Sequence, residues 1–100
     1  MKGVVWGATF GRAQTMIEKI ERNYTYTSAK LIQKRITRNE ISLLYDNGDS
    51  WRAVSARENM RGIRSNIAYI DLKINRDFVN QVIKPTITAF PYQGVHYFYL

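Results

Sequence analysis

The sequence predicts an α/β fold in which a small mixed sheet is flanked by helices. Two stretches, residues 3–6 and 65–71, are apolar runs of the kind found in buried strands, and each is followed by a segment with helical periodicity. Between them lie two short β-type runs separated by Asn47-Gly48, the pair that best tolerates the positive φ angles of a tight hairpin turn. Strands joined through helices, together with a hairpin, make the predicted sheet mixed.

Composition indicates one globular domain over residues 1–100. Of these residues, 45% are apolar and 23% are charged, as in an ordinary globular protein. A chain of 100 residues is long enough for a single core but not for a core and a second module. The chain has no cysteine and one histidine, His96, so neither a disulfide framework nor a multi-ligand zinc site is expected. We find no signal peptide and no run of about 18 to 20 apolar residues, and therefore expect a cytoplasmic protein without a membrane partner.

The first part of the chain reads as a strand, a glycine turn and a helix. Helical periodicity covers residues 10–22, and Thr9 is a suitable cap for the start of this helix. The predicted buried face consists of Ala13, Met16, Ile17 and Ile20. The turn GATFGRAQ lacks the lysine followed by serine or threonine that a phosphate-binding loop requires, so we expect no nucleotide site and no cofactor.

The rest of the chain contains one ambiguous segment and several clear ones. Residues 24–38 fit either a helix or a strand, with Leu31, Ile32 and Ile36 inward. The hairpin over residues 41–56 is followed by an arginine-rich loop over residues 57–64 and a buried strand ending at Asp71. A helix is predicted over residues 77–83, ended by Pro85 or followed by an extended exit, and residues 95–100 form the last strand.

Basic residues are the main indication of a partner. The net charge is +7, and a basic balance favours contact with nucleic acid or another polyanion. The interpretations left open for these side chains are a solvated face, salt bridges to Glu58, Asp49 or Asp71, and a surface that contacts phosphates. The candidate residues for binding nucleic acid or a partner are Lys30, Lys34, Arg35, Arg38, Arg52, Arg57, Arg61 and Arg64.

Aromatic side chains near the end of the chain allow two interpretations. They either pack in the core and at the sheet edge or offer stacking surfaces for bases. The residues concerned are Tyr92, Tyr97, Phe98 and Tyr99.

The stretch from Ile41 to Asp71 resembles the middle of the ATPase domain of phage terminase large subunits. Asn47-Gly48, Arg61-Gly62 and Ile70-Asp71 follow that family's order of turn, Arg-Gly loop and acidic strand end. The resemblance extends to both flanks and implies part of a P-loop NTPase core, truncated so that the P-loop and the nuclease domain are missing. It also implies that Asp71 helps to hold the magnesium of ATP, which makes Asp71 a candidate metal ligand. Leu72 stands where the family has a glutamate that activates water.

Three functions remain open on these observations. The first is a non-catalytic, terminase-like phage or prophage protein that binds DNA or a protein partner, in DNA packaging or in interference with it. Such a piece of a larger sheet exposes strand edges, so we expect a homo-oligomer or a complex with another protein. The second is a small nucleic-acid-binding protein unrelated to packaging. The third is a metal-dependent nuclease or ATPase that uses Asp71 with Asp77, Asp49 or Glu58.

Overall fold

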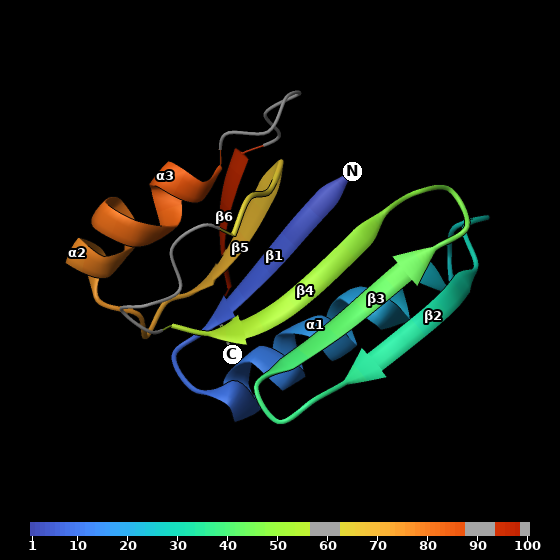
Figure 1. The fold of residues 1–100 in the computed structure, drawn as a ribbon, viewed down its shortest axis with the longest axis horizontal. Helices are drawn as coiled ribbons and strands as arrows, with labels where there is room; N and C mark the ends of the chain where they lie inside the picture. Colours follow the sequence, from blue (N-terminus) through green and yellow to red (C-terminus); the bar gives the residue numbers. More distant parts are fainter. Residues whose placement is uncertain (57–62, 88–93, 99–100) are drawn as a thin grey trace.

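The computed structural model describes residues 1–56, 63–87 and 94–98. In this part of the chain the strands form one six-stranded sheet in the order β2-β3-β4-β1-β5-β6 (Figure 1). None of the helices described is long and apolar enough to cross a membrane. The elements are β1 (Lys2–Gly7), α1 (Phe10–Tyr24), β2 (Leu31–Ile36), β3 (Glu40–Tyr45), β4 (Ser50–Ser55), β5 (Ile67–Asp71), α2 (Arg76–Phe78), η1 (Val79–Ile83), α3 (Lys84–Thr86) and β6 (Gly94–Phe98).

The sheet is mixed, as the sequence predicts. β1 lies between β4 and β5 and pairs with both in parallel, and β6 pairs in parallel with β5. β3 pairs antiparallel with β2 and with β4, so β3 is the strand that runs against the others in the described sheet. The predicted first strand, the hairpin, the buried strand ending at Asp71 and the last strand are confirmed.

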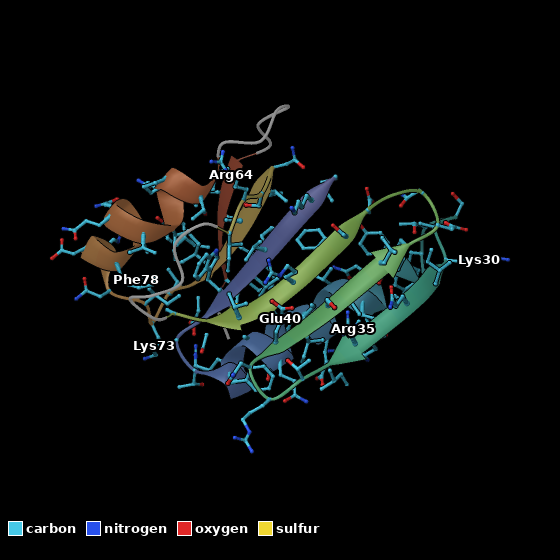
Figure 2. All side chains as sticks on the ribbon, viewed as in Figure 1. Lys30, Arg35, Glu40, Arg64, Lys73 and Phe78 are labelled. Atoms are coloured by element: carbon cyan, nitrogen blue, oxygen red, sulfur yellow. The ribbon has the colours of Figure 1, made fainter. Side chains whose placement is uncertain are left out.

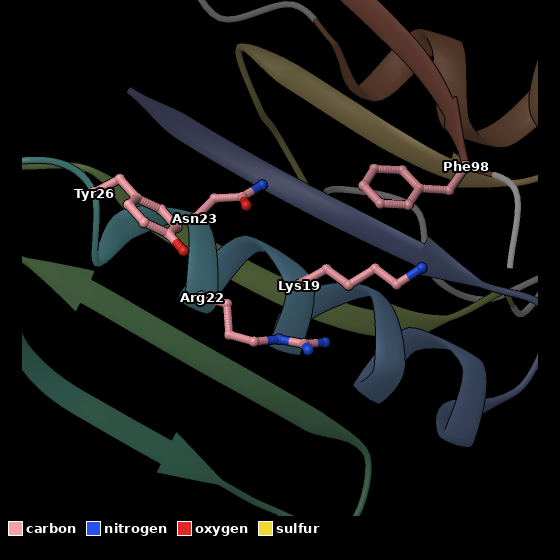
Figure 3. Close-up of a pocket in the computed structure, with 5 residues that line it drawn as sticks. All are labelled: Lys19, Arg22, Asn23, Tyr26 and Phe98. Atoms are coloured by element: carbon pink, nitrogen blue, oxygen red, sulfur yellow. The ribbon is translucent and has the colours of Figure 1, made fainter.

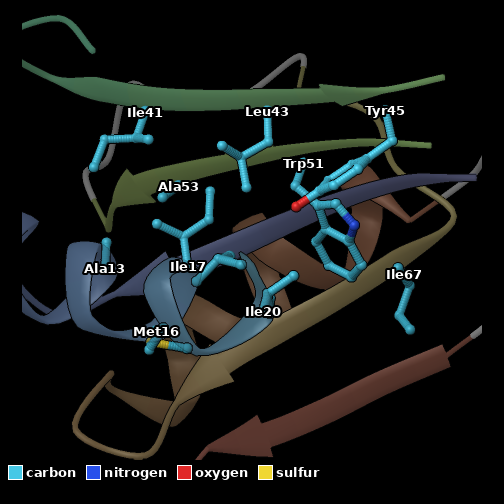
Figure 4. Close-up of a cluster of buried hydrophobic side chains, with 11 residues drawn as sticks. Ala13, Met16, Ile17, Ile20, Ile41, Leu43, Tyr45, Trp51, Ala53 and Ile67 are labelled. Carbon is cyan, nitrogen blue, oxygen red and sulfur yellow. The ribbon is translucent and has the colours of Figure 1, made fainter. Parts of the chain in front are cut away.

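Helix α1 covers one face of the sheet and forms the larger core cluster (Figure 4). The helix begins where Thr9 accepts a hydrogen bond from the Arg12 backbone N–H at 3.2 Å, which satisfies one of the free donors of the first turn. The predicted buried face of the helix is confirmed. It packs against β1, β3 and β4, and the sheet residues of this cluster are Val5, Ile41, Leu43, Tyr45, Trp51, Ala53 and Ile67.

The other face of β1, β4 and β5 packs against the helical segment of residues 76–86. The prediction that Pro85 ends this segment or forces an extended exit is wrong, because Pro85 lies inside the last helical turn. Proline has no backbone N–H to donate within a helix. Just before it the backbone forms a π-type turn, in which the Lys84 N–H donates to the carbonyl of Val79. The helical segment thereby continues through Thr86, which is buried.

The ambiguous segment contains the last residue of α1, an irregular connection over residues 25–30, strand β2, and the start of the turn to β3. All six residues of β2 are exposed, including Ile32 at 62% and Ile36 at 66%, so the prediction that its apolar residues point inward is wrong. The reason is position: β2 is the edge strand beyond β3, whereas α1 packs against β1, β3 and β4. A register shift between Leu31 and Gln33 also interrupts the regular pairing with β3.

The hairpin turn has the positive φ that the sequence predicts at its glycine, but not at Asn47. Gly48 has a φ of +93°, and the Asn47 side-chain oxygen accepts a hydrogen bond from the Asp49 backbone N–H at 2.9 Å. The Arg-Gly pair at Arg61-Gly62 lies outside the described residues, as do Tyr92 and Tyr99.

Candidate functional site

Asp71 ends β5 with its side chain fully buried and bound by protein donors. Arg12 Nε lies 2.5 Å from Oδ2 and Arg12 Nη2 lies 2.8 Å from Oδ1, a two-pronged ion pair between the first turn of α1 and the end of β5. The backbone N–H of Ala8 donates to Oδ2 and that of Lys73 donates to Oδ1, each at 3.0 Å. Each carboxylate oxygen thus accepts two hydrogen bonds, which uses the usual capacity of the group.

This environment strongly favours the charged form of Asp71. The hydrogen bonds from Arg12 lower the pKa of the carboxyl to about 2, against the opposing effect of burial. A magnesium ion would have to displace Arg12 or a backbone N–H to reach either oxygen. In the part of the chain that the structure describes, no three His, Cys, Asp or Glu side chains gather to hold a metal ion. Metal binding at Asp71 therefore stays a prediction, and the geometry instead shows an ion pair that fixes α1 to the sheet.

Gly7, the last residue of β1, has a packing role. A Cβ at this position would lie 2.3 Å from the backbone nitrogen of Ala13 and 2.6 Å from the carbonyl oxygen of Thr9. Only glycine allows the helix to begin this close to the strand end, and the same closeness brings Arg12 within reach of Asp71. Close packing of helix on strand therefore explains the glycine without a bound phosphate.

Four of the eight predicted basic residues lie together at the β2 edge of the sheet. Lys30 directly precedes β2, Lys34 and Arg35 belong to it, and Arg38 lies in the turn to β3; Figure 2 labels Lys30 and Arg35. We call these four residues the β2-edge surface. Lys34 lies opposite Leu43 on the α1 side, and its Nζ is 2.9 Å from Glu21, whereas Arg35 lies opposite Ser42 on the other side. The surface thus presents cations on both faces of one sheet edge.

The other predicted basic residues do not join this surface. Arg52 lies on β4, where its Nε donates to a Glu40 carboxylate oxygen at 2.8 Å in an ion pair across the hairpin. Arg64 lies just before β5, towards the β5–β6 end of the sheet and away from Lys30 at the β2 end (Figure 2). Arg57 and Arg61 lie outside the described residues. The sequence suggested Glu58, Asp49 or Asp71 as ion partners for these arginines, but Asp71 pairs with Arg12 and Asp49 pairs with the amino terminus at 3.1 Å.

Sequence reasoning missed a second basic group on the exposed side of α1. A hollow of about 400 Å³ lies between this helix and β6 (Figure 3). Its helical residues follow the spacing of one helix face, which is a signal that the sequence carries. Phe98, which also lines the hollow, belongs to β6, a strand remote from α1 in the sequence, and only the fold brings it near the helix. The lining residues are Lys19, Arg22, Asn23, Tyr26 and Phe98.

Comparison with known proteins relates the fold to one class of structure. No protein-family model matches the chain, and no curated protein matches it. Two crystal forms of the large terminase from a thermophilic bacteriophage match it with a TM-score of 0.67, at 14% and 13% sequence identity, over 96% of this chain. The fold is similar to part of a phage large terminase. The chain spans about a quarter of the length of those structures, 24% and 25% respectively. The terminase-like fold that the sequence resemblance implies is thereby confirmed.

Proposed function

We propose that this chain is a non-catalytic, terminase-like protein that binds DNA through the β2-edge surface. The observation that carries the proposal is the gathering of Lys30, Lys34, Arg35 and Arg38 at one sheet edge. Among residues 1–56, 63–87 and 94–98, Lys34 is the member of this set with an acidic partner, and that partner, Glu21, is itself partly exposed. Cations without acidic partners at a sheet edge are available to phosphates.

The terminase-like fold supports a role tied to DNA packaging or to interference with it. The absence of catalysis is proposed from two features of the acidic strand end. Arg12 and two backbone N–H groups occupy the oxygens of Asp71, and Leu72 follows where the resemblance calls for a glutamate. A DNA partner implies action in the cytoplasm of a host cell. An acidic protein segment is the alternative occupant of the same surface.

Duplex DNA binding at several salt concentrations tests the proposal. Wild-type protein should bind a labelled duplex with an affinity that falls steeply as salt rises. The triple variant Lys30→Gln, Arg35→Gln, Arg38→Gln should lower the slope of log affinity against log salt by roughly 1 per lost phosphate contact. The matched control is Lys73→Gln, Arg76→Gln, Lys84→Gln, which removes the same charge from exposed positions near α2 and α3.

The control separates a defined surface from a general effect of net charge. We expect the control variant to keep most of the wild-type slope. An equal loss in both triple variants would contradict a role for the β2-edge surface. No duplex binding by the wild-type protein at low salt would contradict DNA as the partner, and an acidic protein segment would then be the occupant to test.

A further inference from the structure

The hollow between α1 and β6, which we call the α1–β6 groove, combines cations with aromatic rings. Lys19, Arg22 and Asn23 project from the exposed side of α1, Tyr26 follows the end of the helix, and Phe98 comes from β6 (Figure 3). No acidic side chain is among these lining residues. The groove shares no residue with the β2-edge surface, and its Phe98 lies on β6, at the other end of the strand order from β2.

The side chains that line the groove carry positive charge, and no ion pair in the described part of the chain neutralises it. Neither Lys19 nor Arg22 forms an ion pair with any residue that the structure describes. Of the nearby helical carboxylates, Glu21 pairs with Lys34 at 2.9 Å, and Glu18 borders a neighbouring hollow that Arg22 also lines. Lys19 and Arg22 are three positions apart on one helix, so both cations face the same side of α1.

The aromatic rings are placed where a planar ligand can reach them. Tyr26 is 90% exposed, so burial in the core does not explain its position. Phe98 packs edge-on against Tyr69, with centroids 5.0 Å apart at 66°, and Tyr69 stacks on Trp51 at 5.2 Å and 7°. Trp51 is buried in the core, so this row of rings supports Phe98 from the inside of the protein. The groove therefore has one firmly supported ring and one exposed ring.

We propose that the α1–β6 groove binds single-stranded nucleic acid. Lys19 and Arg22 contact the phosphates, while Tyr26 and Phe98 each offer a ring on which a base stacks. Asn23 is placed to donate or accept a hydrogen bond at a base edge. Bases in a duplex are stacked on one another and cannot reach these rings, so the groove selects single strands. An acidic peptide would match the charges but would leave the aromatic faces unused.

Oligothymidylate is the probe for this site, and fluorescence anisotropy of the labelled oligonucleotide measures its binding. Tyr26→Ala should weaken binding at least about fivefold, since the stacking of one base on one ring is lost. Tyr26→Phe keeps the ring and should restore binding to within about twofold of the wild type. The double variant Lys19→Gln, Arg22→Gln should lower the salt slope by roughly 1 to 2, whereas Lys84→Gln should leave it unchanged.

An abasic oligonucleotide of equal length and a polyglutamate peptide separate stacking from charge. We expect the abasic strand to bind much more weakly than oligothymidylate and polyglutamate to displace it poorly. Equal binding of the abasic strand, efficient displacement by polyglutamate, or unchanged binding by Tyr26→Ala would each overturn the proposal. Circular dichroism of the variants verifies the fold, which the exposure of Tyr26 should leave intact.

The same variants distinguish this site from the one under the proposed function. The β2-edge triple variant should lose duplex binding and keep oligothymidylate binding, while the groove variants should show the reverse. If the β2-edge variant lost oligothymidylate binding while the groove variants kept it, single strands would bind at β2, and the proposal for the groove would be overturned. Binding of oligothymidylate in the groove without any duplex binding would overturn the proposed function and leave the groove in place.

Discussion

Arg12 and Asp71 form an ion pair that joins the first turn of α1 to the carboxyl end of β5. The guanidinium meets the carboxylate through two nitrogen atoms, and the carboxylate is fully buried while about a third of the arginine side chain is exposed. In open α/β sheets, the carboxyl ends of the strands are where ligands bind. In this chain the acidic residue at that edge is bound by the protein's own helix and therefore contributes to holding the fold together.

Replacement of Asp71 by asparagine should destabilise the protein by about 3 kcal/mol. The substitution removes the charge from one partner of a buried ion pair. It also replaces one carboxylate oxygen by an NH₂ group, which cannot accept hydrogen bonds such as those that Ala8 N–H and Arg12 Nε donate to Oδ2. Urea denaturation at neutral pH measures the free energy of unfolding. Asp77→Asn, at an exposed position in the first turn of α2, is the matched control and should change stability by less than about 0.5 kcal/mol. Equal effects of the two substitutions would contradict a structural role for the pair.

The stability contributed by Asp71 should disappear in acid. Its pKa is lowered from 3.8 to about 2 in the folded protein, so the unfolded chain binds the proton first as pH falls. The contribution is complete above about pH 4 and is lost as the pH falls through about 2. The difference in unfolding free energy between wild type and Asp71→Asn should therefore shrink by about 2 kcal/mol over this window. A difference that stays constant from pH 5 to about pH 2 would show that the carboxylate does not titrate in this way.

Features that depend on neighbours in the sequence were predictable. The capping of α1 by Thr9 and the turn at Asn47-Gly48 follow from the conformations that these residues favour locally. The buried face of α1 follows from the helical period. The partner of Asp71 was not predictable, because Arg12 lies 59 residues away and only the pairing of β1 with β5 brings it near.

Features that depend on position in the sheet were not predictable. The apolar residues of β2 fit either a helix or a strand with its apolar side inward, and the edge position, which no local pattern encodes, leaves Ile32 and Ile36 exposed. The same holds for the basic candidates. Sequence proximity grouped Arg52 and Arg64, whereas the fold pairs Arg52 with Glu40 and places Arg64 before β5.

Gly7 at the end of β1 and Gly11 in the first turn of α1 should respond to alanine in opposite ways. Gly7→Ala places a Cβ 2.3 Å from the Ala13 backbone nitrogen, so the helix must shift, at a cost of about 2 to 3 kcal/mol. Gly11→Ala meets nothing closer than the Thr9 hydroxyl at 4.0 Å and should stabilise the helix by about 0.5 kcal/mol. Thermal denaturation of both variants measures these effects. A neutral Gly7→Ala would show that the glycine is not needed for packing and would reopen the question of a ligand at this turn.

Self-association through β2 should rise with salt, opposite to DNA binding. β2 ends the strand order, so its outer edge has no neighbouring strand in the described sheet, and Ile32 and Ile36 are exposed beside it. Pairing two copies there brings together their β2-edge cations, which repel until salt screens them over distances of about 10 Å at 0.1 M and 3 Å at 1 M. Sedimentation velocity should show a larger fraction of dimer at high salt for the wild type. The double variant Ile32→Ser, Ile36→Ser should form little dimer. Leu72→Ser, at an exposed apolar position away from β2, is the control and should dimerise like the wild type. A monomer at every salt concentration, or dimers that survive the double substitution, would contradict association through this edge.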